Sequence, residues 1–174
     1  ISRGLVGSEM CIRDRAGTVG QSLFDAYSAA FPKANFLVWN RTHERALYMV
    51  KNKSNAVAVE NLEAGVKRAD IITCATMSKQ PIIKGEWLIP GQHLDLIGAY
   101  RPDMREVDDL ALCRSTKFVD SYDTTLDHIG ELKIPLKNNV ISRADILADF
   151  YGLGNFIRRS NDEITFFKNG GGAH

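Results

Sequence analysis

The stretch CIRDRAGTVGQS, residues 11–22, contains the pattern from which the fold can be predicted. Its glycines at Gly17 and Gly20 are spaced like the last two glycines of the G-x-G-x-x-G turn that binds dinucleotides. One such glycine lets the backbone approach a pyrophosphate, and the other lets the following helix pack closely on its strand. Arg15 stands where the first glycine belongs. The motif alone is equally compatible with a helix that merely begins at a glycine.

The segments that follow this turn alternate between strand-like and helix-like patterns. This order predicts an α/β fold, a Rossmann-like doubly wound parallel sheet with helices on both faces and strand order 3-2-1-4-5-6. The predicted strands span residues 35–40, 56–59, 70–75, 92–97, 116–120 and 163–167, and the predicted helices span 18–31, 43–52 (capped by Thr42), 62–69 (capped by Asn61), 104–112 and 143–158.

Composition narrows the function classes. The 174 residues carry a net charge of +1 and no basic block, which argues against nucleic acid or an anionic membrane as partner. No apolar run approaches the ~18 residues of a membrane span. The three cysteines contain no C-x-x-C, and the four histidines share no helical spacing. We therefore expect no metal site, no disulfide framework and a cytoplasmic location.

The end of the second predicted strand bears on the choice of cofactor. Asn40 lies twenty residues after Gly20, where an NAD-binding domain places an acid for the ribose 2′-hydroxyl. Arg41 follows it and can bind a 2′-phosphate, with Asn40 and Thr42 adding neutral hydrogen bonds. The alternative is a solvated turn residue followed by a helix cap. The motif logic favours NADP(H) over NAD(H).

Thr76 and Ser78 follow the predicted strand 70–75 at its carboxyl end, the cofactor side of an open α/β sheet. There they can bond the ribose or the nicotinamide end. The full set of predicted cofactor-binding residues is Ala16, Gly17, Thr18, Val19, Gly20, Asn40, Arg41, Thr42, Arg45, Ala75, Thr76, Met77, Ser78, Gly98 and Ala99.

The chain resembles the ornithine cyclodeaminase/μ-crystallin family over residues 16–174. The middle block is specific, because it combines a strand, a C-A-T-x-S loop, G-E-W-L-x-P-G, a second strand and G-A-x-x-P-D-M-R-E. The matching stretches are AGTVGQSL, VWNRTHERA, ADIITCATMSKQPIIKGEWLIPGQHLDLIGAYRPDMREVDD, FVDSYDTTLDHIGELKIPL and DEITFFKNGGGAH.

The resemblance implies a missing part. Family members carry an N-terminal substrate and dimerisation domain, which holds the basic residues that grip the substrate carboxylate. Residues 16–142 then form the NAD(P)-binding domain, and 143–174 return toward the missing domain. We expect the intact parent to be a homodimer and the fragment alone to be inactive. Residues 1–15 resemble translated adapter or assembly sequence, and the alternative is a divergent strand with charges at its phosphate-facing end.

The resemblance leaves three functions open: NAD(P)H-dependent reduction of a cyclic ketimine or imino acid, ornithine cyclodeamination with NAD⁺, and non-catalytic NADPH binding as in a crystallin. Cyclodeaminases of this family have a sequence similar to G-G-D-C-P after the fifth strand, and the aspartate of this motif takes part in the chemistry. Tyr100 stands in its place, and a phenol gives up its proton far less readily than a carboxylic acid. This departure favours the reductase.

The acids near this loop have plainer interpretations. Asp103 is a weak catalytic candidate, because Pro102-Asp103 can simply cap the helix of residues 104–112. Arg105 and Glu106 would then lie on its solvated face. A second group of acids suits a strand end and solvated helix positions better than a metal site: Asp120, Asp123, Asp127 and Glu131.

Overall fold

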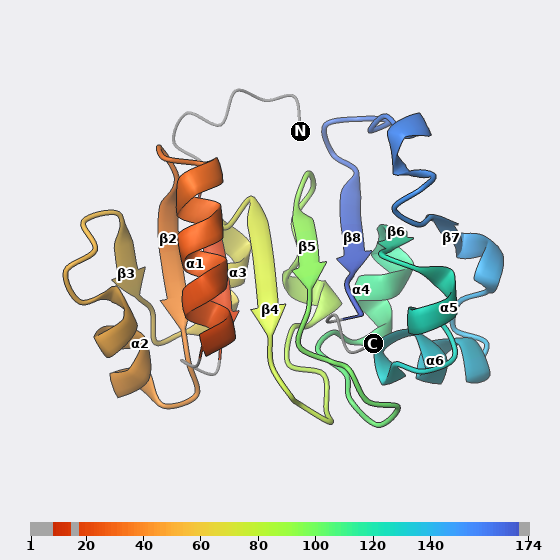
Figure 1. The fold of residues 1–174 in the computed structure, drawn as a ribbon, viewed down its shortest axis with the longest axis horizontal. Helices are drawn as coiled ribbons and strands as arrows, with labels where there is room; N and C mark the ends of the chain where they lie inside the picture. Colours follow the sequence, from red (N-terminus) through yellow and green to blue (C-terminus); the bar gives the residue numbers. More distant parts are fainter. Residues whose placement is uncertain (1–8, 15–17, 171–174) are drawn as a thin grey trace.

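The computed structural model describes residues 9–14 and 18–170 of the chain (Figure 1). Eight strands form one sheet in the order β3-β2-β1-β4-β5-β8-β6-β7, and every neighbouring pair is parallel. The strands are β1 (Glu9–Asp14), β2 (Asn35–Trp39), β3 (Ala56–Ala58), β4 (Ile71–Ala75), β5 (His93–Leu96), β6 (Ser115–Val119), β7 (Ile146–Ala148) and β8 (Ile164–Lys168).

The helices lie on both faces of this sheet, as the alternating pattern predicts. In Figure 1, α1 lies in front of the strands, and α3 and α4 lie behind them. The α-helices are α1 (Thr18–Ala30), α2 (His43–Val50), α3 (Leu62–Arg68), α4 (Asp109–Arg114), α5 (Tyr122–Thr125) and α6 (Gly130–Lys137), with 3-10 turns η1 (Gly85–Trp87), η2 (Arg143–Asp145) and η3 (Leu153–Asn155).

Each face of the sheet packs into its own apolar core. Phe36 and Val38 of β2 point to one side, where they meet Phe24 of α1. Leu37, between them, points to the other side, where it packs in one cluster with Val66 of α3. Successive strand residues alternate between faces, so a strand buried on both sides must be apolar throughout. The two cores confirm the doubly wound arrangement.

The strand order agrees with the expected 3-2-1-4-5 up to β5 and then departs from it. The predicted strand at 163–167 exists as β8, but it enters the sheet between β5 and β6. It pairs with both neighbours, and its Phe166 is fully buried. The periodicity of a strand indicates that it forms, but not between which strands it lies, so this position was missed.

The central strand of the sheet lies before residue 16, where the family resemblance places the start of the cofactor domain, and the domain bounds stay a prediction. β1 pairs with β2 on one side and β4 on the other, so Glu9–Asp14 form the middle of the sheet. This arrangement corresponds to the divergent-strand alternative for these residues. Residues 1–8 and 15 lie outside the described part, and the origin of the leader stays a prediction.

The helix predicted at 143–158 is wrong. The chain there forms η2, β7 and η3, and β7 pairs with β6. Ile146 and Ala148 are buried on the sheet, while Asp149 Oδ1 accepts hydrogen bonds from the Tyr151 and Gly152 amides and turns the chain away. Strand pairing and a local side-chain turn therefore outweigh the helical spacing. β7 and β8 both lie in the same sheet as β1 to β6.

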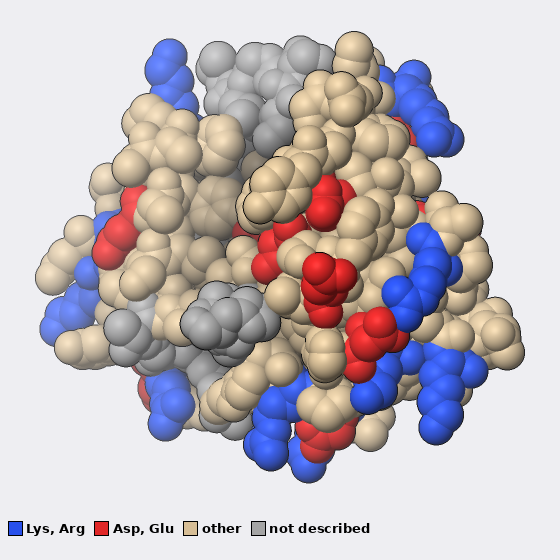
Figure 2. All heavy atoms as spheres, turned by 45° about the vertical axis from the view of Figure 1, so that its right-hand side comes forward, with Lys and Arg blue, Asp and Glu red and all other residues tan. Residues whose placement is uncertain are grey.

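The surface carries both signs of charge. On the face shown in Figure 2, a group of acidic side chains lies near the middle, and the rim carries many Lys and Arg side chains with a few acidic ones among them. This face is therefore mixed in charge rather than uniformly basic. Among the described helices, none is long and apolar enough to cross a membrane.

Candidate functional site

The start of α1 is the predicted phosphate-binding element. Thr18 begins the helix, Val19 is exposed and Gly20 is buried. The first turn contains no acidic side chain. In Figure 1 this end of α1 lies at the same edge of the sheet as the loops that follow β4 and β5. The other two predicted residues of this turn, Ala16 and Gly17, lie outside the described residues.

The turn after β2 assigns different tasks to its polar residues. Asn40 is buried, and its Oδ1 accepts a hydrogen bond of 2.9 Å from the Thr42 amide, so its side chain shapes the turn. Thr42 is the N-cap residue of α2, as predicted, but its side chain makes no capping hydrogen bond. Arg41 and Arg45 are exposed and form no ion pair with another described residue. The side chains of Arg41, Thr42 and Arg45 therefore remain available to a ligand at this turn.

The loops after β4 and β5 meet at the carboxyl edge. A Cβ atom at position 98 would lie 2.0 Å from the Thr76 nitrogen and 2.3 Å from its oxygen, so only glycine permits this approach. The structure thus brings together two predicted groups, Ala75–Ser78 and Gly98–Ala99. Met77 is 40% exposed at this edge, and Tyr100, 45% exposed, donates its hydroxyl to Met77 Sδ at 3.7 Å.

Glu106 corrects the solvated-face interpretation, because its side chain is fully buried. Its Oε1 accepts hydrogen bonds from the Thr76 amide at 2.7 Å and the Thr76 hydroxyl at 3.1 Å. Its Oε2 accepts from the amides of Gly98 at 2.9 Å and Ala99 at 3.0 Å. One carboxylate therefore links the loop after β4 to the loop after β5.

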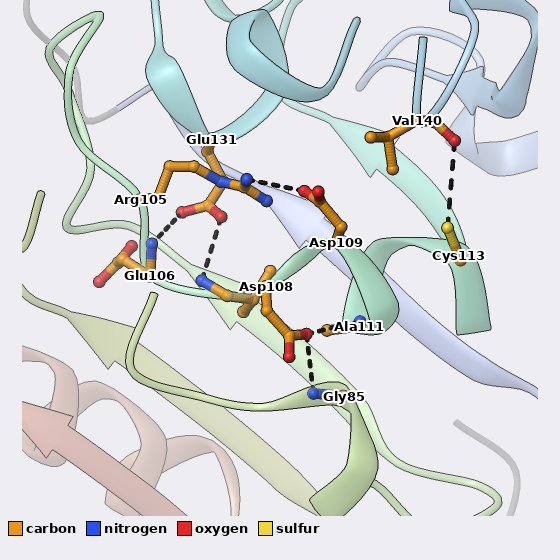
Figure 3. Close-up of polar contacts among 10 residues, drawn as sticks. Gly85, Arg105, Glu106, Asp108, Asp109, Ala111, Cys113, Glu131 and Val140 are labelled. Atoms are coloured by element: carbon orange, nitrogen blue, oxygen red, sulfur yellow. Dashed lines mark hydrogen bonds and ion pairs between the residues drawn. The ribbon is translucent and has the colours of Figure 1, made fainter. Parts of the chain in front are cut away.

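Glu131, on α6, is also fully buried, where a solvated position was expected. It accepts hydrogen bonds from the amides of Glu106 at 2.6 Å and Val107 at 3.1 Å (Figure 3). Burial and then the nearby charge of Glu106 raise the pKa of Glu131 to about 7. Lys168 of β8, equally buried, donates to the carbonyls of Leu96 and Asn169, and burial lowers its pKa.

The sequence missed this cluster because the expected helix at 104–112 begins five residues later. Asp108 caps α4 by accepting the Ala111 amide at 2.9 Å, so residues 104–107 are not helical. Arg105 is buried as well, and its NH1 donates to Asp109 Oδ1 at 2.7 Å. The signal that could have located the cluster is Asp108 in the stretch REVDD, residues 105–109. Aspartate is a preferred N-cap residue, so it indicates a helix that begins after Asp108.

Asp103 caps no helix. Its exposed carboxylate pairs with Lys79 at 2.8 Å, next to the loop of residues 75–78. The hydrogen bond from Lys79 lowers the pKa of Asp103. A carboxylate held ionised by a lysine is a poor proton donor, which weakens Asp103 as a catalytic acid.

Comparisons with known proteins identify the family. The sequence pattern of the ornithine cyclodeaminase/mu-crystallin family matches residues 8–173. The chain is 47% identical to the Δ1-pyrroline-2-carboxylate reductase of Paracoccus denitrificans over 91% of its own length and 53% of that protein. It is 32% identical to the ketimine reductase mu-crystallin of Mus musculus, over 96% of this chain and 52% of the relative.

The solved structures give the same picture. The Δ1-pyrroline-2-carboxylate reductase of Thermococcus litoralis, in complex with NADH and L-proline, superposes with a TM-score of 0.86 at 26% identity. The match covers 94% of this chain and 53% of that one. The chain spans about half the length of the relatives it matches. It belongs to the ornithine cyclodeaminase/mu-crystallin family.

Proposed function

We propose that this chain is the main part of the NAD(P)H-binding domain of a reductase that acts on cyclic ketimine carboxylates of the Δ1-pyrroline-2-carboxylate type. The observation that carries the proposal is the 47% identity to a reductase named for that substrate. The match covers 91% of this chain. The substrate carboxylate would be held by the part of the family's fold that this chain does not span.

The residues at the carboxyl edge fit a dinucleotide. Because the first turn of α1 has no acidic side chain, the positive end of the helix can face a phosphate. Gly17 and Gly20 would hold the pyrophosphate, and the backbone wall of Thr76 and Gly98 would lie along the nicotinamide end. When bound, the reduced nicotinamide supplies the hydride that converts a C=N bond to an amine.

We further propose that NADPH is preferred to NADH. The residue after β2 is Asn40 rather than an acid, so no carboxylate there would repel a 2′-phosphate. Arg41, Thr42 and Arg45 are exposed beside it and have polar groups available. A guanidinium binds a phosphate in a bidentate way, which supports this choice.

Tyr100 supports reduction over cyclodeamination. It lies in the loop after β5, and its hydroxyl contacts Met77. At this position the family resemblance gives cyclodeaminases an aspartate that takes part in the chemistry. Imine reduction needs a carboxylate anchor and a proton source, but no base that activates an amine. A phenol at this position is therefore compatible with the reductase and unsuited to the cyclodeaminase.

The experiment joins this chain to a complete N-terminal domain of the family and assays two activities together with NADPH binding. We expect NADPH oxidation on Δ1-pyrroline-2-carboxylate and no ammonia from ornithine. Tyr100→Asp should retain imine reduction, because that aspartate is not needed for it. Ammonia release from ornithine without NADPH oxidation on the imine would overturn the proposal. NADPH binding without either activity would favour the crystallin-like alternative.

A further inference from the structure

We propose that Glu106 is a positioning residue that fixes the nicotinamide end of the cofactor site. The inference rests on the proposed function, because it assigns a role in that same site. It names a residue that touches neither cofactor nor substrate. The Glu106 side chain is fully buried, so it acts through the groups that it holds, three backbone amides and the Thr76 hydroxyl.

The geometry of the carboxylate carries the proposal. Each oxygen receives two donors, and the two pairs come from different loops: Thr76 binds Oε1, and Gly98 and Ala99 bind Oε2. Carboxylate oxygens accept such bonds more strongly than neutral acceptors do. The relative position of the two loops therefore depends on one side chain that follows both of them in the chain.

The residues that Glu106 holds are direct neighbours of two residues that border the carboxyl edge of the sheet. Met77 follows Thr76, and Tyr100 follows Ala99, and both side chains are partly exposed at the same place. Their sulfur and hydroxyl are in contact across the gap between the loops. A change in the spacing of the loops would move these surface groups directly, whereas the turn after β2 is shaped by the Asn40 side chain.

Glu106 is fixed from behind by Glu131. Figure 3 shows the Glu131 carboxylate reaching the backbone of Glu106, while the Glu106 carboxylate points away from it. Lys168 is the buried cation nearby and offsets part of the negative charge. Thr76 and Ala99 are buried as well, so a donor there that loses its acceptor has little access to water in its place.

Glu106→Gln is the informative variant. The amide keeps the shape of the side chain, but it replaces one accepting oxygen by an NH₂ group that cannot accept a hydrogen bond. One of the two loops must then lose its acceptor. Asp108→Ala is the matched control, since the Asp108 carboxylate also accepts two backbone amides, Gly85 at 2.8 Å and Ala111 at 2.9 Å. Neither of these amides belongs to the two loops.

The first measurement compares two ligands on the 174-residue chain, NADPH and 2′-phospho-ADP-ribose, which lacks the nicotinamide. Loss of a charge-assisted hydrogen bond should weaken NADPH binding about tenfold in Glu106→Gln. Binding of 2′-phospho-ADP-ribose should stay unchanged. Asp108→Ala should shift both ligands equally. An equal loss for both ligands in Glu106→Gln would make Glu106 a general stability residue and overturn the proposal.

The second measurement needs no ligand. Amide hydrogen exchange at Thr76, Gly98 and Ala99 should rise about tenfold at one of the two loops in Glu106→Gln and stay unchanged in Asp108→Ala. Unchanged exchange at all three amides in Glu106→Gln would also overturn the proposal. A native chain that binds neither nucleotide would count against the proposed function, while the exchange rates would still decide whether Glu106 holds the loops.

Discussion

Replacing Glu131 by glutamine should remove a pH dependence from the stability of the fold. The Glu131 side chain is fully buried. Desolvation and the negative charge of Glu106 raise its pKa from 4.5 to about 7. Lys168 and the amides of Glu106 and Val107 act in the opposite direction and are outweighed. Between pH 4.5 and about 7 the folded protein therefore holds a proton on Glu131 that the unfolded chain has already released.

The sign follows from linkage. Below pH 4.5 the carboxyl is protonated in both states, and its neutral form makes the full contribution to stability. As the pH rises from 4.5 to about 7, only the unfolded state releases the proton, so the free energy of unfolding falls. The rise in pKa corresponds to a loss of about 3 kcal/mol over that interval.

Glutamine carries no titratable proton, so Glu131→Gln should lack this slope. The NH₂ group of the glutamine cannot accept a hydrogen bond, so one of the two backbone amides that Glu131 binds loses its acceptor. This loss lowers the free energy of unfolding by about 1–3 kcal/mol at every pH. Urea unfolding followed by tryptophan fluorescence at pH 4.5, 6 and 7.5 gives both numbers. The control is Glu63→Gln, which removes an exposed carboxylate paired with Lys67 and should change stability by less than about 1 kcal/mol. Parallel pH curves for the native chain and Glu131→Gln would refute the reasoning.

Two further substitutions test the edge of the sheet. Arg41→Ala should weaken NADPH binding roughly tenfold to a hundredfold and leave NADH binding unchanged, because only the 2′-phosphate contact is lost. Equal affinities of the native chain for the two nucleotides would contradict this. Gly98→Ala should lower the thermal midpoint, since the new methyl would lie 2.0 Å from the Thr76 nitrogen. A midpoint equal to that of the native chain would show that the two loops can separate without loss of thermal stability.

The sequence predicts the first half of the fold well because its signals there are local. The helix at α1, the strand at β2 and the Asn61 cap of α3 each follow from spacing or from one side chain, and the Asn61 side chain does accept the Ala64 amide. The position of β8 depends instead on a pairing between segments about seventy residues apart, such as His93 with Thr165. No local pattern encodes such a pairing.

The site divides in the same way. The loops at Thr76 and Gly98 were predicted because they follow strands that periodicity identifies, and the structure brings them together. Glu106 and Glu131 were expected in solvent because an acid within a helical pattern is normally solvated. Their burial depends on where α4 begins and on backbone donors that converge from other segments, and the sequence shows neither.

The buried charges also bear on where the cofactor domain ends. Lys168, the buried cation beside Glu106 and Glu131, is the last residue of β8, and it donates to the carbonyl of Leu96 at the end of β5. A chain that ends at residue 142 would lose this cation and leave β5 as an unpaired edge. It would also keep two buried carboxylates with less charge compensation, which is strongly destabilising.

We therefore expect a chain of residues 1–142 to unfold without a cooperative transition, although a domain boundary at 142 was predicted from the family resemblance. A chain that ends at residue 170 is the control. It retains β8 and the bond from the Gly170 amide to Asp120, and it should unfold cooperatively in urea. A cooperative transition of the 1–142 chain, with the same urea midpoint as the control, would show that β7 and β8 are dispensable and that the buried carboxylates need no lysine.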